Sequence, residues 1–256
     1  MTVRQLPGFR AHTSAGAGRL AELVARGPRD WYRLEAKGKS ATVHIYDEIG
    51  FWGTTAADFA RDVGALDVDS IDLRLNSPGG SVFDGVAIHN TLLNHRARVD
   101  VTVDGVAASI ASVIAMAGDS VTMGRGTRMM IHESSGLALT NKRGMREMAD
   151  LLDELDHDIA GFYAHRAGGS VDQWLASMEA ETWYSAQEAV DAGLADAVLG
   201  ADDKPKDAAP RTFDLTAYGF RYAGRDQAPS PVAAARKTRS DAARARVLDA
   251  LGGVHR

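Results

Sequence analysis

The chain has 256 residues, of which 45% are hydrophobic and 25% charged, which is close to ordinary globular usage and sufficient for one sizeable α/β core. A net charge of −5 gives no electrostatic reason to expect nucleic-acid binding, and the absence of cysteine excludes disulfides, thiolate nucleophiles and cysteine-based zinc sites. No apolar run approaches the roughly 20 residues that cross a bilayer, so we expect a cytoplasmic protein without a membrane segment.

The first part of the chain is expected to change from an irregular arm to alternating strands and helices. Residues 1–38 mix glycine, alanine, arginine and serine and predict an N-terminal leader or arm. "SATVHIYDEIG" alternates like a strand, and "TTAADFARDVGAL" has helical spacing with Thr54 or Thr55 available as N-cap. "SIDLRLNS" then predicts a strand that ends at the Pro-Gly-Gly turn of residues 78–80.

The following elements continue this alternation. "VFDGVAIHNTLLNH" has helical spacing, "VDVTVDGV" alternates as a strand, a helix opens at Ser109, and "DSVTMG" and "TRMMIHE" are typical of short strands. Repeated strand–helix–strand units favour an α/β fold with a parallel sheet and right-handed crossovers. Catalytic groups in such folds tend to lie at the C-terminal ends of the strands.

The longest helical pattern is "TNKRGMREMADLLDELDHDIAGFYAHRAGG", which carries an apolar stripe and stops at Gly168-Gly169. The stripe has two interpretations, core packing or an oligomer interface. "SVDQWLASM" and "SAQEAVDAG" predict two shorter helices, each with a serine as N-cap. We therefore expect one main domain at residues 39–200, followed by a flexible Ala/Arg-rich tail at residues 201–256 with a short helix at 240–251.

Ser109 is the first candidate for chemistry. A serine hydroxyl becomes a good nucleophile only when a base takes its proton and donors stabilise the oxyanion that forms on the attacked carbonyl. The start of a helix directs backbone N–H groups toward such a carbonyl, and the small neighbours in "DGVAASIASVIAMAG" allow a substrate backbone to approach. Taken alone, Ser109 could equally be an ordinary N-cap in a helix of small residues.

Two further fragments are ambiguous when each is taken alone. "NSPGG" is an ordinary turn signal, but a glycine pair after a strand also offers N–H groups that can form half of an oxyanion hole. His132 ends an apolar strand, where it could be a hydrogen-bonded core residue or a neutral imidazole that acts as a base. Their occurrence together with Ser109 favours the catalytic interpretation.

No cofactor or metal is expected. Asp153 and His157 lie four residues apart on the long helix and could form a metal pair, but without an evident third ligand a solvated helix face is the better interpretation. "GTTAADFARDVG" lacks the glycine and lysine spacing of a phosphate loop, so no nucleotide site is indicated.

Four segments occur in a characteristic order between Asn76 and Asp196. They are "NSPGGSV", "DGVAASIASVIAMAGD", "MMIHE" and "ETWYSAQEAVDAGLAD". Together they resemble the proteolytic subunit of the Clp protease family (ClpP). Within this family, the segments "YDEIGFWGTTAADF" and "ETWYSA" most resemble the sequences of the ClpP-related head maturation proteases of phages and prophages. The resemblance implies a crotonase-like spiral of βαβ units with a protruding helical handle, and a serine endopeptidase that uses a Ser-His-acid triad.

The resemblance also implies a role for individual positions. The implied site consists of Ser109 as nucleophile, His132 as general base and then acid, the backbone N–H groups of Gly80 and Ile110 as oxyanion hole, and Gly79, Ser81 and Val82 as substrate contacts.

The third triad member departs from the family pattern. Glu181 stands before "TWYSA" where the housekeeping enzymes carry an aspartate, and Glu179 is the nearby competitor. A glutamate can orient an imidazole and stabilise an imidazolium as an aspartate does, although its extra methylene changes the reach.

The resemblance implies partners as well. Protein or peptide substrates are expected, and so is a homo-oligomer of stacked rings, heptameric or tetradecameric, in which the helix at residues 140–165 docks one ring on the other. A phage context, with the protein in the host cytoplasm, would add capsid or scaffold partners. The alternative is a general Clp-type subunit that works with an ATP-dependent unfoldase, although the N-terminal arm does not obviously match the axial segment that engages one.

Three other classes of protein are possible alternatives. A signal-peptide-peptidase-like enzyme would use a Ser-Lys dyad and usually a membrane segment. A crotonase-type acyl-CoA enzyme has no need of a serine nucleophile with a histidine. A non-catalytic ring protein would keep the fold without needing the set formed by Gly80, Ser109 and His132.

Overall fold

The computed structural model describes residues 30–50, 53–200 and 213–231. The expected arm before residue 30 and the expected short helix at residues 240–251 lie outside the described residues.

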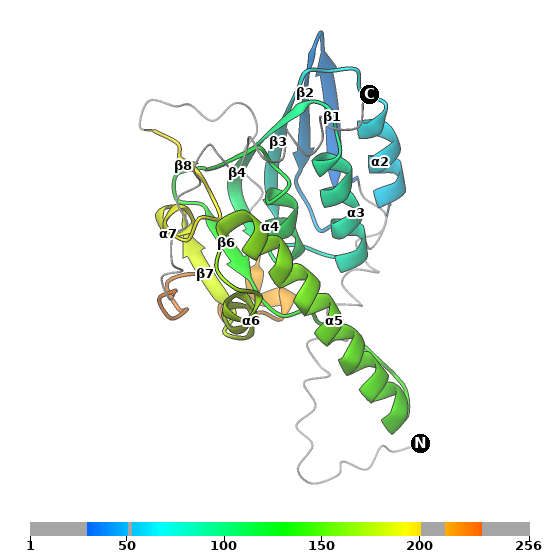
Figure 1. The fold of residues 1–256 in the computed structure, drawn as a ribbon, viewed down its shortest axis with the longest axis vertical. Helices are drawn as coiled ribbons and strands as arrows, with labels where there is room; N and C mark the ends of the chain where they lie inside the picture. The colour runs from blue at the N-terminus through cyan, green and yellow to red at the C-terminus, as the bar shows by residue number, and fades with distance from the viewer. Residues whose placement is uncertain (1–29, 51–52, 201–212, 232–256) are drawn as a thin grey trace, which may run out of the picture.

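One sheet of eight strands forms the centre of the molecule (Figure 1). Its strands are β1 (Tyr32–Lys37), β2 (Ser40–Ile45), β3 (Ser70–Ser77), β4 (Arg98–Ala108), β5 (Ser120–Met123), β6 (Arg128–Ile131), β7 (Thr182–Ser185) and β8 (Ala197–Val198). The main path runs β1-β2-β3-β4-β5-β8, and β6 joins β4 and pairs with β7. All pairs are parallel except β1–β2 and β6–β7, so the expected α/β class with a largely parallel sheet is confirmed.

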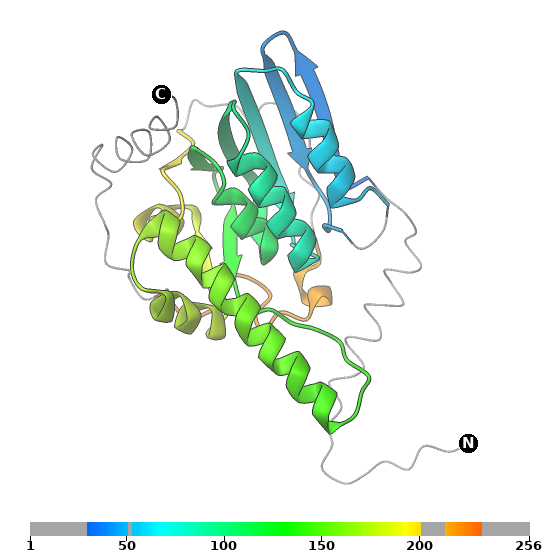
Figure 2. The same cartoon turned by 45° about the vertical axis from the view of Figure 1, so that its right-hand side comes forward.

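The connecting helices form where the sequence predicts them. They are α2 (Ala56–Gly64), α3 (Val82–Leu93), α4 (Ile110–Ala115), α5 (Lys142–Ala167), α6 (Val171–Glu179) and α7 (Ala186–Asp191). Thr55 is the N-cap of α2: its hydroxyl oxygen accepts from the Asp58 N–H, and the Asp58 carboxylate accepts from the Thr55 N–H. Figure 2 shows α2, α3 and α4 side by side across one face of the sheet.

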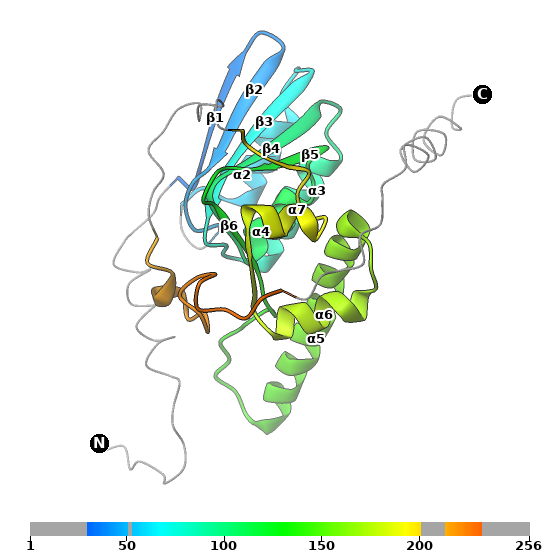
Figure 3. The ribbon, with the colours of Figure 1, turned by 90° about the vertical axis from the view of Figure 1, so that its left-hand side faces the viewer.

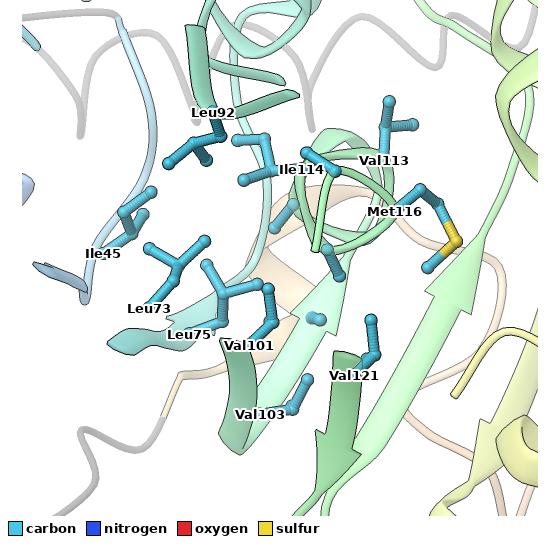
Figure 4. Close-up of a cluster of buried hydrophobic side chains, with 14 of the residues drawn as sticks. Ile45, Leu73, Leu75, Leu92, Val101, Val103, Val113, Ile114, Met116 and Val121 are labelled. Carbon is cyan, nitrogen blue, oxygen red and sulfur yellow. The ribbon is translucent and has the colours of Figure 1, made fainter. Parts of the chain in front are cut away.

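The core fills the space between this sheet face and the helices. Because β2 to β5 alternate, every second side chain points to the helix layer and loses its contact with water. The close-up in Figure 4 shows apolar side chains gathered from β2, β3, β4 and β5 and from α3 and α4. Its labelled members are Ile45, Leu73, Leu75, Leu92, Val101, Val103, Val113, Ile114, Met116 and Val121.

The apolar stripe of the long helix α5 is buried along only part of its length, so core packing explains that part and an oligomer interface stays a prediction for the rest. Its C-terminal half is core, with Ile159, Ala160 and Tyr163 buried, whereas Met145 and Leu151 near the other end are exposed. Figures 1 and 2 show this other end projecting away from the body. The helix therefore has the form of the expected handle.

The structure differs from the expectations at both ends of the main domain. Tyr32–Lys37, inside the predicted leader, form β1 and pair with β2 in antiparallel register. Residues 213–231, inside the predicted flexible tail, pack on Val106, Ala108, Met130 and Trp183. The average composition of residues 201–256 hides a local group of aromatic residues in "FDLTAYGFRY", and this group supplies the apolar surface that packs.

Candidate active site

The C-terminal ends of β3, β4 and β6 meet at one edge of the sheet. Ser77 pairs with Ala107, and Ala108 pairs with Met130. The chain leaves β3 through the Pro-Gly-Gly turn, leaves β4 at Ser109 and leaves β6 just before His132. Three fragments that are distant in sequence therefore come together where α/β folds place their chemistry.

Ser109 and His132 form a direct hydrogen bond, with the serine Oγ 2.8 Å from the imidazole Nε2. Ser109 occupies the N-cap position of α4, but its side chain makes no capping hydrogen bond. The interpretation of Ser109 as an ordinary N-cap is thus wrong, because the hydroxyl is directed to the histidine instead. A nucleophile and a base within hydrogen-bond reach are the core of an acyl-transfer site.

The backbone of Ser109 adopts φ 55° and ψ −133°, a conformation that costs about 1–3 kcal/mol for a residue other than glycine. The neighbouring groups hold it there. The Ser109 N–H donates to the Met130 carbonyl at 2.9 Å, and the Ser112 hydroxyl donates to the Ser109 carbonyl at 2.6 Å. Ser112 also shares a buried hydrogen bond of 2.8 Å with the Tyr163 hydroxyl, which connects α4 to α5.

The Gly79-Gly80 turn lies beside Ser109. Two backbone hydrogen bonds connect this turn to Ile49. The Ile49 N–H donates to the Gly79 carbonyl at 2.8 Å, and the Ser81 N–H donates to the Ile49 carbonyl at 2.9 Å. In such a parallel bridge the Gly80 N–H points away from Ile49. Ile110 begins α4, where the first N–H groups of a helix have no intrahelical acceptor. These are the two N–H groups expected to form the oxyanion hole.

The other expected substrate contacts also have structural roles. Gly79 has φ 103° and lies against the Ser109 side chain. The Ser81 hydroxyl caps α3 by accepting from the Asp84 N–H at 3.4 Å, and Val82 packs against the main core. A role for them in binding substrate stays a prediction.

Glu181 and His132 lie at the same end of the β6–β7 pair. The antiparallel register ends with Ile131 opposite Thr182, so His132 directly follows and Glu181 directly precedes this last pair. The Glu181 side chain is buried, whereas Glu179 at the end of α6 is exposed. Position and burial therefore favour Glu181 over Glu179 as the acid near the imidazole.

Sequence reasoning missed the groups that bind Glu181. One carboxylate oxygen accepts from the Arg221 N–H at 2.5 Å, and the other accepts from the Tyr222 N–H at 2.8 Å and from the Trp183 indole at 3.2 Å. The Phe220 ring lies edge-to-face on His132, with the ring centroids 5.3 Å apart. The aromatic residues of "FDLTAYGFRY" are the signal that could have pointed to this segment.

Two other acidic groups near the site have shifted pKa values. Partial desolvation of its carboxylate, followed by repulsion from Asp156, Glu179 and Asp153, raises the pKa of Glu133, although the residue as a whole is exposed. A hydrogen bond from Arg225 lowers the pKa of Glu188 to about 2, with smaller contributions from Ser185. The Glu188 carboxylate is therefore charged through the range in which a serine and histidine pair would work.

No group of three potential metal ligands occurs within residues 30–50, 53–200 and 213–231, and Asp153 and His157 both lie on α5. In the same described ranges, no helix combines the length and apolar character needed to span a bilayer.

Comparison with known proteins gives consistent matches. The family model described as Clp protease matches residues 40–202. The ATP-dependent Clp protease proteolytic subunit of a Bacteroides fragilis strain is 32% identical over 166 residues, which cover 60% of this chain and 80% of that protein. The corresponding subunit of Bacteroides thetaiotaomicron is 30% identical over 166 residues, covering 60% and 76%.

A solved structure matches as well. A mutant of ClpP1 from Listeria monocytogenes superposes with a TM-score of 0.55 at 26% identity and covers 63% of this chain and 92% of that one. The resemblance noted in the sequence is thus confirmed at the level of the family, and the phage subtype stays a prediction.

Proposed function

The chain belongs to the Clp protease family, and we propose that it is a serine endopeptidase whose nucleophile is Ser109 and whose general base is His132. The proteases of this family are serine peptidases. The observation that carries the assignment to these residues is the 2.8 Å hydrogen bond between the two side chains at the edge where β4 and β6 end.

Hydrolysis proceeds in two steps in this proposal. Ser109 Oγ attacks the peptide carbonyl while His132 Nε2 takes its proton, and the N–H groups of Gly80 and Ile110 stabilise the oxyanion. The C–N bond then breaks, and His132 gives the proton to the leaving amine. A water molecule attacks the resulting ester, its proton goes to His132 and then to the departing Ser109 oxygen, and the second product leaves.

Glu181 is the third member of the triad in this proposal. Its burial and its position at the same end of the β6–β7 pair as His132 support the role of a carboxylate that stabilises the imidazolium formed during each step. Its two oxygens already accept three hydrogen bonds from Arg221, Tyr222 and Trp183. A carboxylate has about four acceptor positions, so capacity for a bond from the imidazole remains.

Two biological roles fit this chemistry. The resemblance of the segments "YDEIGFWGTTAADF" and "ETWYSA" to phage head maturation proteases favours a role in maturing a phage head, with capsid or scaffold protein as substrate. The names of the Bacteroides relatives favour a proteolytic subunit that serves an ATP-dependent unfoldase. In either role, α5 is the handle by which rings of this chain stack, supported by exposed Leu137, Leu139 and Met145 near its outer end.

A fluorophosphonate probe tests the chemistry. We expect labelling at Ser109, located by peptide mass spectrometry, that disappears in Ser109→Ala and His132→Ala but persists in the control Ser177→Ala, whose hydroxyl bonds the α6 backbone. Absence of labelling in a folded, assembled wild-type protein would contradict the protease assignment and favour a ring protein without catalysis.

Native mass measurement tests the assembly. A mass of seven or fourteen subunits is the expected result by family resemblance, and a monomer alone under native conditions would contradict it. Cleavage of purified scaffold protein without ATP would support the head maturation role, whereas degradation only with an unfoldase and ATP would support the general Clp role.

A further inference from the structure

Residues 213–231 form a segment that lies outside the range matched by the family model, which ends at residue 202. Figure 3 shows this segment in orange beside β6. Its apolar side chains join the cluster made by Val106, Ala108, Met130 and Trp183. The segment therefore packs on β4, β6 and β7, and His132 directly follows β6 while Glu181 directly precedes β7.

Three consecutive residues of this segment contact both side chains of the expected base and acid pair. The Phe220 ring packs edge-to-face on the His132 imidazole at a centroid distance of 5.3 Å. The N–H groups of the next two residues, Arg221 and Tyr222, donate to the two oxygens of Glu181 at 2.5 and 2.8 Å. One ring and two adjacent backbone N–H groups of this short stretch thus contact the imidazole and the carboxylate at the same time.

Residues 213–231 are also anchored on β7 and α7, the two elements that follow Glu181 in the chain. The Arg225 guanidinium donates to both oxygens of Glu188 on α7, at 2.7 and 2.5 Å. Ala228 is buried beside Trp183, whose ring also lies 6.1 Å from Phe220. These contacts hold residues 220–222 in place at a distance from the reacting atoms.

We propose that residues 220–222 act as a clamp on the His132–Glu181 pair and that Phe220 is a positioning residue for the general base. The proposal rests on the proposed function of Ser109 and His132. Phe220 limits rotation of the imidazole and keeps water from one side of it. The two N–H groups compensate the buried charge of Glu181, which would otherwise oppose its placement beside the base.

A different role, that of a cover which switches the site off, is less compatible with the geometry. A cover would be expected to separate the nucleophile from its base. The Ser109–His132 hydrogen bond is 2.8 Å with the segment in place, so the clamp and the productive pair coexist. We therefore expect that loosening the segment lowers the activity rather than raising it.

The test measures the rate of fluorophosphonate labelling at Ser109 against pH in the full-length chain. Phe220→Ala is expected to slow labelling about 10- to 100-fold, because a misplaced base loses part of its contribution. It is also expected to move the half-maximal rate to higher pH, because water reaching the imidazole favours its charged form. Phe220→Tyr keeps the ring and should restore both readouts.

Phe213→Ala is the matched control, since it removes a phenyl ring from the same hydrophobic cluster and leaves Phe220 on His132. It should leave the pH profile unchanged. Labelling that is unaltered or faster in Phe220→Ala, or equally slowed with the same profile in Phe213→Ala, would overturn the clamp while the protease assignment stands. Absence of labelling in the wild-type protein would instead contradict the proposed function, and the clamp with it.

Discussion

Gly79 lies so close to Ser109 that a Cβ atom added to the glycine would be 2.6 Å from the serine Cβ and 3.2 Å from its Oγ. The same atom would be 2.8 Å from the Ala108 carbonyl oxygen, which belongs to the backbone and cannot swing away. Gly79 also has φ 103°, a conformation that side chains rarely adopt. Space and backbone conformation therefore both require glycine beside the nucleophile.

Gly79→Ala should displace Ser109 and lower the rate of acylation about 100-fold or more, because a shift of about 1 Å at a reacting atom has an effect of that size. Gly126→Ala is the matched control, since Gly126 also has a positive φ of 74° but open space around it. The control should cost about 1 kcal/mol of stability and leave acylation unchanged. Equal rates for both variants in a labelling time course would refute the close contact.

Ser112 supports the strained backbone of Ser109 and is supported in turn by Tyr163. Ser112→Ala removes the hydroxyl donor to the Ser109 carbonyl, which keeps the Ser112 backbone N–H at 2.9 Å, and leaves the buried Tyr163 hydroxyl without this partner. We expect a loss of about 1–3 kcal/mol in the free energy of unfolding and slower labelling of Ser109. Denaturant unfolding and the labelling rate measure the two effects.

Tyr163→Phe provides the comparison for this support. It removes the phenol but keeps the bond from Ser112 to the Ser109 carbonyl, so it should cost only about 0.5–1.5 kcal/mol and leave labelling near the wild-type rate. If both variants slowed labelling alike, the hydroxyl of Ser112 would have no particular connection to the nucleophile.

The sequence was sufficient to predict the elements that form from local patterns. The strand at residues 70–77 and the helix after Thr55 appear as predicted, because alternation and capping are properties of a few neighbouring residues. The pairing of Ser109 with His132 was expected from the family resemblance, and the structure brings the two side chains together because β4 and β6 are parallel neighbours that end at one edge of the sheet.

The sequence was not sufficient where distant residues determine the structure. Nothing near Glu181 in the chain predicts that its acceptors are occupied by N–H groups of Arg221 and Tyr222, about forty positions away. Strand β1 was not predicted for a similar reason. Its residues are mostly exposed and show no clear strand pattern, and it is the pairing with β2 that makes them a strand.

The ion pair between Arg225 and Glu188 should make the attachment of residues 213–231 sensitive to acid. Because the pKa of Glu188 is about 2 in the folded protein, below the ordinary value of 4.5, the pair stabilises the fold above about pH 4.5 and loses this contribution as the pH falls toward 2. Both side chains are partly exposed, so the contribution is about 0.5–1 kcal/mol.

Thermal unfolding at several pH values measures this dependence. Arg225→Met should be less stable than the wild-type protein at pH 7, and the difference should shrink as the pH falls below about 4. Glu188→Gln removes the charge and keeps an oxygen that can accept from the Ser185 N–H, so its own loss toward acid should also be weaker. A constant difference between wild type and Arg225→Met across this range would contradict the assignment.

Glu181 is the residue for which anchoring and catalysis can be separated. Glu181→Gln keeps the shape but offers one carbonyl oxygen to three donors, so it should cost about 1–3 kcal/mol of stability. If Glu181 also stabilises the imidazolium, the variant should lose about 10²- to 10⁴-fold in kcat with little change in KM, and Glu181→Asp should recover part of the loss. Trp183→Phe, which removes a single donor and keeps the charge, should retain kcat. A folded Glu181→Gln enzyme with kcat near that of the wild type would restrict Glu181 to anchoring the segment, because a charge without effect on the rate cannot be the third member of the triad.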